Sequence, residues 1–296
     1  MKTVLLTGAT GYIGRHVLKS LFNLCHNAPG KIRIISIIRN IKEIEDSIPE
    51  YVQYINYDFS KNEDHSELIE RMNGAPDILI HLAWSSGFDH NSDDHINYIS
   101  AHYKFITNLI ANGTSTVCVA GSFRECGACS GKIDENCTCQ DLNNYALAKN
   151  TLRKALEIYQ ESKSFSFRWL RYFTPIGDEE HNNSILSKIL KWDAEGRKSF
   201  GFTDGSEMYD YIPIDKLADY TVKIALQNSV QGIINVCSGQ ATSLKDVVEK
   251  FIEDRSLRIR PDYGKFQRRG YDPALIYGDT EKLKLALKAF DDEFSS

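Results

Sequence analysis

Short apolar runs alternate with amphipathic stretches along the chain up to residue 172. The apolar runs predict strands at 3–7, 32–38, 52–56, 77–82, 116–121 and 166–172. Between them, apolar residues at helical spacing predict helices near 12–24, 62–72, 94–112 and 143–162. Strands that alternate with helices run parallel and are joined by right-handed crossovers. The pattern therefore predicts an α/β fold, a doubly wound parallel sheet with helices on both faces.

After residue 173 the alternation becomes irregular, and loop-like and polar segments separate the predicted elements. The pattern predicts a strand at 209–213, an apolar run at 232–237 and helices near 184–195, 215–228 and 243–254. We therefore predict two units. One is a Rossmann domain made of 1–173 plus about 211–236, and the other is a smaller mixed α/β C-terminal lobe made of about 174–210 plus 237–296.

Composition and charge narrow the class of protein. The chain has 42% apolar and 25% charged residues and a net charge of −5, with both signs spread along it. This excludes a basic footprint for nucleic acid. Because there is neither an apolar run near twenty residues nor a secretion signal at the start, we predict no membrane association and a cytoplasmic location.

A glycine-rich turn follows the first predicted strand and precedes the first predicted helix. Gly8, Gly11 and Gly14 are spaced three residues apart. A strand that turns sharply into a helix gathers unpaired N–H groups and the positive end of the helix dipole, where a pyrophosphate can bind. Glycine permits the tight turn and the close approach. The motif predicts dinucleotide binding, and the alternative is an ordinary strand-to-helix turn.

Tyr145 and Lys149 lie four residues apart on a predicted helix, so their side chains share one face. An ammonium near a phenol favours the phenolate, which predicts a tyrosine that exchanges protons near neutral pH. Ser122 follows the predicted strand at 116–121, where its hydroxyl could hold a substrate oxygen. The alternative for the helix is a surface Tyr/Lys pair.

Taken together, these motifs resemble the extended short-chain dehydrogenase/reductase superfamily, in particular its nucleotide-sugar epimerase/dehydratase family. The matching segments are Thr7 to Gly14, Asp77 to Ala83, Ser122, Tyr145 with Lys149, Arg171 to Phe173, and Tyr209 to Asp215. The resemblance implies Ser122, Tyr145 and Lys149 as the catalytic trio and a sugar nucleotide bound under the C-terminal lobe. It also implies a homodimer packed through the two helices before and carrying Tyr145.

The resemblance further implies a dinucleotide cofactor along the carboxyl ends of the first strands. The predicted cofactor-binding residues are Gly8, Thr10, Gly11, Tyr12, Ile13, Gly14, Arg39, Asn40, Asp58, Phe59, Leu82, Ala83, Tyr145 and Lys149. The second strand is followed by Arg39 and has no carboxylate until Glu43, whereas NAD-selective relatives carry an acid near this point. A cation there favours a 2′-phosphate, so we predict NADP(H). For Asp58 the alternative role is a helix cap.

Departures from the family pattern narrow the reaction. Phe123 and Arg124 occupy the positions where 4,6-dehydratases carry an Asp-Glu pair, so elimination of water is not expected. Tyr209 stands where many relatives have an arginine that clamps the diphosphate, and Arg268 or Arg269 could replace it. A solvated basic loop is the alternative. The predicted substrate-binding residues are Trp84, Ser85, Ser86, Phe88, Arg124, Arg268 and Arg269.

These observations favour an NADPH-dependent 4-ketoreductase that acts on a nucleotide-linked deoxysugar or heptose in surface polysaccharide biosynthesis. A C4 or C3/C5 epimerase on the same scaffold is the nearest alternative, the latter with Cys126 and His181 as conceivable acid and base. From another class, a non-catalytic NADP-binding sensor is the alternative. The sequence indicates neither the nucleotide nor the sugar, nor the stereochemistry at C4.

Four of the seven cysteines lie close together in the sequence, at Cys126, Cys129, Cys137 and Cys139. Their spacing could hold a structural zinc ion, but no histidine joins them and the gap between the two pairs is short. We predict unpaired thiols in a loop and no metal site.

Overall fold

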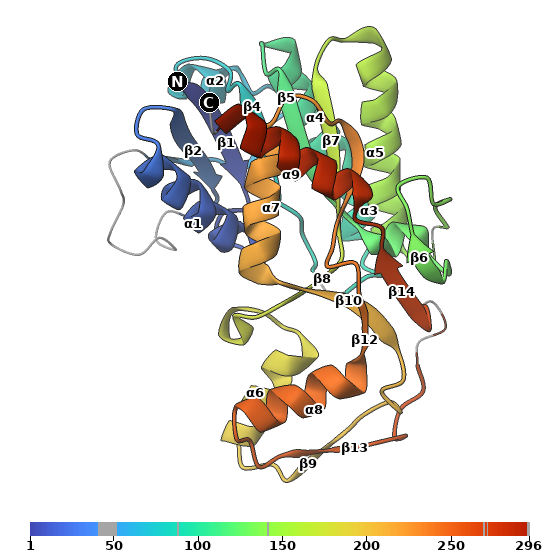
Figure 1. The fold of residues 1–296 in the computed structure, drawn as a ribbon. Helices are drawn as coiled ribbons and strands as arrows, with labels where there is room; N and C mark the ends of the chain where they lie inside the picture. Colours follow the sequence, from blue (N-terminus) through green and yellow to red (C-terminus); the bar gives the residue numbers. More distant parts are fainter. Residues whose placement is uncertain (41–51, 88, 141, 269, 271, 295–296) are drawn as a thin grey trace.

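The computed structural model describes residues 1–40, 52–87, 89–140, 142–268, 270 and 272–294. Within this part of the chain the centre is a seven-stranded parallel sheet in the order β11-β7-β5-β4-β1-β2-β3 (Figure 1). Its strands are β1 (Lys2–Thr7), β2 (Ile32–Ile38), β3 (Val52–Asn56), β4 (Ile78–His81), β5 (Thr116–Ser122), β7 (Ser166–Tyr172) and β11 (Gly232–Val236). The predicted doubly wound sheet is confirmed. The strand order reverses between β1 and β4, and ligands bind at such a point in open α/β sheets.

Helices cover both faces of this sheet. One face carries α1 (Tyr12–Asn27), α7 (Ile214–Leu226) and α9 (Glu281–Phe294), and the other carries α2 (Ser66–Arg71), α4 (Ile99–Ala111) and α5 (Asn144–Ser162). Tyr98 separates α4 from the short α3 (Asp94–Asn97), so the helix predicted at 94–112 is two helices. Each face buries its own apolar cluster, and two-sided burial explains the continuous apolar runs of the strands.

The last helix belongs to the larger unit. Leu283, Ala286 and Phe290 on α9 are buried in the same cluster as Val17 of α1 and Val222 of α7. The prediction that placed all of 237–296 in the smaller lobe is therefore wrong for 281–294. The physical reason is the apolar stripe of α9, which packs onto α7 and β11.

The smaller lobe contains α6 (Ile185–Ala194), α8 (Leu244–Asp254) and a parallel pair, β9 (Ser199–Gly201) with β13 (Arg260–Asp262). Figure 1 shows these elements below the main sheet. The lobe has an apolar core of its own, separate from the two clusters on the main sheet. Its buried members are Leu186, Ile189, Phe200, Phe202, Val248, Ile252 and Ile259.

A second sheet joins the two units. Its strands are β12 (Ala241–Ser243), β10 (Met208–Pro213), β14 (Leu275–Gly278) and β6 (Gly131–Ile133), and β8 (Thr174–Ile176) pairs with β10. Only β10 was predicted. Because β6 lies between β5 and α5 in the chain, this sheet connects the segment that leads from Ser122 to Tyr145 with strands at the edge of the lobe.

Candidate active site

The glycine turn after β1 is a point of close backbone packing. Gly8 has a φ of +76°, and a Cβ added there would lie 2.7 Å from the backbone nitrogen of Ala83, just after β4. A Cβ on Gly14 would lie 1.9 Å from the carbonyl oxygen of Gly8. Since only glycine fits at both positions, β1, α1 and the end of β4 meet at the reversal of strand order.

The first turn of α1 is suited to an anion. Gly11 is the residue before the helix, and among the described residues no side chain caps it and no acid stands in the first turn. The backbone N–H groups of this first turn, together with the positive end of the helix dipole, favour binding of a phosphate. Ala83 donates its backbone N–H to the Thr7 hydroxyl at 3.2 Å, which brings Leu82 and Ala83 beside the turn. The residues here fit a dinucleotide pyrophosphate.

Other predicted cofactor residues lie around this turn or along the neighbouring strand ends. Thr10 is exposed, Ile13 packs on the core, and the Tyr12 hydroxyl donates to the carbonyl of Gly177 at 2.7 Å. Arg39 and Asn40 are exposed directly after β2. None of these contacts tests cofactor binding, so the roles stay predictions.

Asp58 caps the short helix η2 (Phe59–Lys61). Its carboxylate accepts from the backbone N–H of Ser60 at 3.1 Å and from the Ser60 hydroxyl at 2.6 Å. The structure therefore shows the capping role that the sequence left open. Phe59 stacks on Phe105 with a ring separation of 4.8 Å. Contact of either residue with an adenine stays a prediction.

The structure brings the predicted trio together. Ser122 ends β5, and Tyr145 and Lys149 lie one turn apart on α5. The Ser122 side chain lies close enough to the Tyr145 hydroxyl to lower its pKa, and the Lys149 ammonium donates to the carbonyl of Ala120 at 2.6 Å. The strand that carries Ser122 thus also holds the lysine, so α5 and β5 position all three groups relative to one another.

The electrostatics of the trio differ from the expectation. Burial raises the pKa of Tyr145 to about 12, against the Ser122 side chain and the charge of Arg124, which lower it. The Lys149 ammonium lies 5.8 Å from the centre of the Tyr145 ring. It also lies 3.6 Å above the ring of Trp84 and bonds to Ala120, and burial lowers its own pKa to about 7. The prediction of a tyrosine made acidic by Lys149 is therefore wrong in this structure.

A buried carboxylate, Glu125, lies behind the trio and was missed. It belongs to the short helix η3 (Phe123–Cys126) and is fully buried. Its Oε1 accepts from the backbone N–H of Ser122 at 2.7 Å, and both oxygens accept from Trp169 Nε1. Burial raises the pKa of Glu125, while the nearby Arg171 lowers it. A signal was present, because Ser followed three residues later by Glu is the capping-box pattern.

Trp84 forms the wall between the trio and a pair of buried histidines. It stacks on His102 with ring centroids 4.5 Å apart and meets Tyr145 edge-on at 6.2 Å. His102 bonds to His81 at 2.8 Å, and burial lowers its pKa to about 3, so it is neutral at pH 7. The indole also donates to His95 at 3.0 Å. Trp84 is both firmly packed and in contact with two catalytic candidates.

The residues after Trp84 form a loop beside α3. Ser85 is partly buried, and Ser86 has a φ of 59° and donates its hydroxyl to Asp94 at 2.7 Å. Phe88 and Arg269 lie outside the described residues. The substrate contacts predicted for this loop are not tested.

Arg124 and Arg268, two of the predicted substrate-binding arginines, both influence the pKa of Tyr209. Arg124 pairs with Asp272 at 2.7 Å, and Arg268 is exposed in a groove of about 450 Å³ on the lobe. Burial raises the pKa of Tyr209, and the charges of both arginines oppose that rise. Arg124 and Arg268 thus both act electrostatically on the position where many relatives carry an arginine, and Asp272 opposes them there. A role of either arginine in holding a diphosphate stays a prediction.

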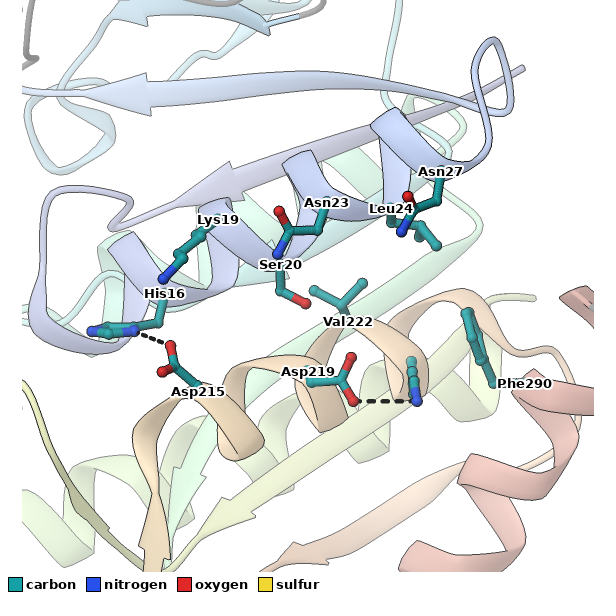
Figure 2. A pocket seen from close by; sticks show the side chains of 11 residues that line it. His16, Lys19, Ser20, Asn23, Leu24, Asn27, Asp215, Asp219, Val222 and Phe290 are labelled. Carbon is teal, nitrogen blue, oxygen red and sulfur yellow. Dashed lines mark hydrogen bonds and ion pairs between the residues drawn. The ribbon is translucent and has the colours of Figure 1, made fainter.

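A further groove of about 390 Å³ lies between α1 and α7 and contains none of the predicted site residues (Figure 2). At one end, His16 bonds to Asp215 at 2.7 Å and to Asp178 at 2.9 Å. Figure 2 shows the ring of His16 directed from α1 towards α7. Because Asp178 follows β8, the contact of His16 with Asp178 links α1 to the start of the smaller lobe.

The four clustered cysteines do not meet as a set of four. Cys137 Sγ lies 3.3 Å from Cys129 Sγ, with Cys126 close by, whereas Cys139 contacts a guanidinium nitrogen of Arg153 at 3.7 Å. Over the described ranges, no group of three or more His, Cys, Asp or Glu side chains has an arrangement that could hold a metal ion. No helix in that same part of the chain is long and apolar enough to span a bilayer.

Comparisons with known proteins find relatives of this chain. A sequence profile of the NAD dependent epimerase/dehydratase family matches residues 4–237. A curated relative from Aggregatibacter actinomycetemcomitans, dTDP-6-deoxy-L-talose 4-dehydrogenase (NAD(+)), is 33% identical over 276 residues, which is 93% of this chain and 98% of the relative.

Solved structures share the fold. The UDP-glucuronic acid 4-epimerase of Bacillus cereus, in complex with UDP-glucuronic acid and NAD, is similar with a TM-score of 0.80 and 19% identity, over 97% of this chain and 93% of the epimerase chain. The UDP-N-acetylglucosamine 4-epimerase of Methanobrevibacter ruminantium M1 is similar with a TM-score of 0.80 and 19% identity, over 99% and 98% of the two chains.

Proposed function

Because the chain belongs to the NAD dependent epimerase/dehydratase family, we propose that it reduces the C4 keto group of a nucleotide-linked deoxysugar with a nicotinamide dinucleotide. The convergence of Ser122, Tyr145 and Lys149 at the end of β5 carries the proposal. The curated relative is named for chemistry at position 4 of a dTDP-linked 6-deoxysugar, which supports the same position here. Phe123 and Arg124 in place of an acidic pair argue against dehydration.

In this proposal the turn at Gly8, Gly11 and Gly14 holds the cofactor pyrophosphate. When bound, the nicotinamide supplies the hydride that reduces C4. Ser122 and Tyr145 hold the C4 oxygen, and the Tyr145 phenol transfers its proton to that oxygen. The preplaced donors stabilise the charge that develops there. Lys149 would hold the nicotinamide ribose, as the family resemblance implies.

Tyr145 is protonated at neutral pH, because burial raises its pKa to about 12. In the proposed reaction this protonated phenol donates to the C4 oxygen, and in the reverse reaction the same group accepts the proton. The net use of cofactor, rather than this pKa, therefore separates a reductase from an epimerase.

The predicted preference for NADP(H) depends on Arg39. Its guanidinium is exposed directly after β2, where it can meet a 2′-phosphate. The NAD(+) in the name of the curated relative favours the other cofactor. If the proposal is right, Arg39→Ala weakens NADPH binding roughly 10- to 100-fold, the range expected when a charge-assisted contact is lost, and leaves NADH binding unchanged. Tighter binding of NADH by the unchanged protein contradicts it.

A C4 epimerase is the second candidate, favoured by the 4-epimerases among the similar structures. The two differ in cofactor use, because a reductase consumes one reduced nicotinamide per product and an epimerase consumes none. A C3/C5 epimerase lacks support, since the Cys126 thiol is fully buried and His181 pairs with Asp178. The proposal also includes a homodimer through α4 and α5, where Ile158 is 66% exposed.

The test is a panel of 4-keto sugars linked to dTDP, GDP, CDP and UDP, assayed by the loss of reduced-nicotinamide absorbance. We expect one stoichiometric reaction, and we expect Tyr145→Phe to reduce kcat about 100- to 10,000-fold because the proton donor is lost. Tyr159→Phe, on the same helix, is the matched control and should leave kcat unchanged. Wild-type turnover by Tyr145→Phe excludes the assignment, and turnover without net cofactor consumption favours the epimerase.

A further inference from the structure

Three sulfur atoms meet on the segment that leads from Ser122 to Tyr145, outside the proposed chemistry. Cys137 Sγ lies 3.3 Å from Cys129 Sγ, and Cys126 is near enough to Cys137 for the two thiols to affect each other's pKa. Cys129 and Cys137 are both partly exposed, whereas Cys126 is fully buried. A small reagent in solution can therefore reach the first two thiols and not the third.

The distance between Cys129 and Cys137 suits a covalent bond between them. A disulfide has an S–S length near 2.05 Å, so the two sulfur atoms need to approach by only about 1.3 Å. The same distance fits a zinc site poorly, since sulfur ligands of a tetrahedral Zn²⁺ at about 2.3 Å are roughly 3.8 Å apart. The described residues also supply no third and fourth ligand in a suitable arrangement.

A buried guanidinium faces the cluster. Arg171 is fully buried and donates Nη1 to the carbonyl of Asp134 at 3.2 Å, while its Nε and Nη2 have no hydrogen-bond partner among the described residues. Its charge opposes the rise that burial causes in the pKa of Cys126 and Cys137. The guanidinium is not free for the thiols alone, because its Nε also lies 3.9 Å from the buried carboxylate of Glu125. A cation near thiols still favours the thiolate that forms or leaves during exchange.

We propose that Cys129 and Cys137 are a dithiol that a small-molecule disulfide oxidises to an intramolecular disulfide. One protein thiolate attacks the small disulfide, forms a mixed disulfide and releases one small thiol. The second protein thiolate then attacks the protein sulfur of the mixed disulfide, and the second small thiol leaves. The pair loses two electrons and two protons, and the small disulfide gains them. A thiol of the same class reverses the reaction.

The bridge closes a short loop that contains β6. Cys129 follows η3, with its backbone N–H donating to the carbonyl of Cys126 at 3.2 Å, and η3 is capped by Ser122. The closed loop is anchored at its centre by the pairing of β6 with β14. Because the sulfur atoms already touch, closure stabilises this segment and leaves Ser122 and Tyr145 in place. The bridge should raise the unfolding temperature and leave kcat nearly unchanged.

The experiment equilibrates the protein with mixtures of reduced and oxidised glutathione, alkylates the remaining thiols and maps the peptides by mass spectrometry. We expect a cross-linked pair of Cys129 and Cys137, the loss of two alkylation sites per molecule, and full reversal by reduced dithiothreitol. We also expect a higher unfolding temperature for the oxidised protein. Cys129→Ser and Cys137→Ser should abolish both effects, and Cys139→Ser, which alters a cysteine of similar exposure nearby, should keep them.

Peptide mapping of the unchanged protein tests the proposal even if a cysteine variant fails to fold. Seven alkylated cysteines under the most oxidising mixture would overturn the proposal, as would a bridge between Cys126 and Cys137 in place of the expected one. Zinc bound to the protein as purified, and released by Cys137→Ser, would also overturn it and identify a metal site.

Discussion

The two ends of the proposed active site are held in place by different kinds of interaction. At the turn after β1, backbone packs against backbone, and the determining residues, Gly8 and Gly14, have no side chain. At the end of β5, Ser122 and Tyr145 stand in front of buried charged groups, with Glu125 and Lys149 fully enclosed. The first end is determined by steric contact and the second by electrostatics.

This difference determines how each end responds to a perturbation. Steric overlap with backbone atoms cannot be relieved by rotating a side chain, so a substitution at the turn must displace a helix or a strand. A buried charge responds instead through protonation, so a substitution near the trio changes the pH at which the site functions. The comparison thus predicts a loss of stability and cofactor binding at one end and a shift of the pH profile at the other.

The largest effect is expected for Gly14→Ala. The new Cβ would lie 1.9 Å from the Gly8 oxygen and 2.9 Å from the Ala9 Cα, all backbone atoms, so α1 must move away from β1. We expect a loss of about 3 kcal/mol or more in the free energy of unfolding, at or above the upper range for overpacking, and no measurable dinucleotide binding. Urea unfolding and a fluorescence titration with the cofactor measure the two effects.

Gly11→Ala is the matched control for that substitution. Its Cβ would lie 3.2 Å from the same Gly8 oxygen, a tight contact that a small adjustment relieves. We expect a loss of at most about 1 kcal/mol. Equal losses for the two variants would show that Cβ contact with Gly8 does not determine this end of the site.

Much of the larger unit could be predicted because its information is local. The apolar runs of β1, β2 and β5 carry their own signal, and so does the glycine turn. The three-residue strands β9 and β13 carry none, since each is defined only by a partner about sixty residues away. The packing position of α9 was not predicted for the same reason. Its apolar stripe indicates that one face is buried, but not which helix that face packs against.

The candidate site divides in a similar way. The sequence places Ser122, Tyr145 and Lys149 on one strand end and one helix face, and the structure brings them together. The direction of the Tyr145 pKa could not be predicted, because burial decides it and burial depends on the whole fold. Glu125 could have been found from its spacing to Ser122, but its contact with Trp169 is tertiary.

A second, smaller effect is expected for Glu125→Gln. The amide oxygen can take the place of Oε1 and keep both the Ser122 N–H and the Trp169 N–H. The new NH2 group then stands at the place of Oε2, where it faces the Trp169 N–H and the Arg171 guanidinium and has no acceptor, at a cost of about 1–3 kcal/mol. The charge of Glu125 raises the pKa of both Tyr145 and Lys149, so its removal lowers both. Thermal unfolding and the pH dependence of kcat measure these changes.

Glu161→Gln provides the control for Glu125→Gln, because it removes the same charge from an exposed position near the end of α5. It should leave both the unfolding temperature and the pH profile unchanged. If Glu125→Gln lowered stability without moving the pH profile, the carboxylate would be a structural cap only, and the electrostatic account of this end of the site would fail.

The smallest effect is expected for Trp84→Leu, which removes the aromatic face 3.6 Å from the Lys149 ammonium. A cation over an aromatic ring gains about 0.5–2 kcal/mol, so its loss lowers the pKa of Lys149 further below about 7. If catalysis uses the ammonium, the alkaline limb of the kcat profile moves to lower pH by about 0.4–1.5 units.

Trp192→Leu is the control for Trp84→Leu. It removes an indole that contacts Arg197 in the smaller lobe and should leave the pH profile of kcat unchanged. An unchanged alkaline limb in Trp84→Leu would show that the indole does not hold the lysine in its charged form, and the tuning of this end of the site would then rest on Glu125.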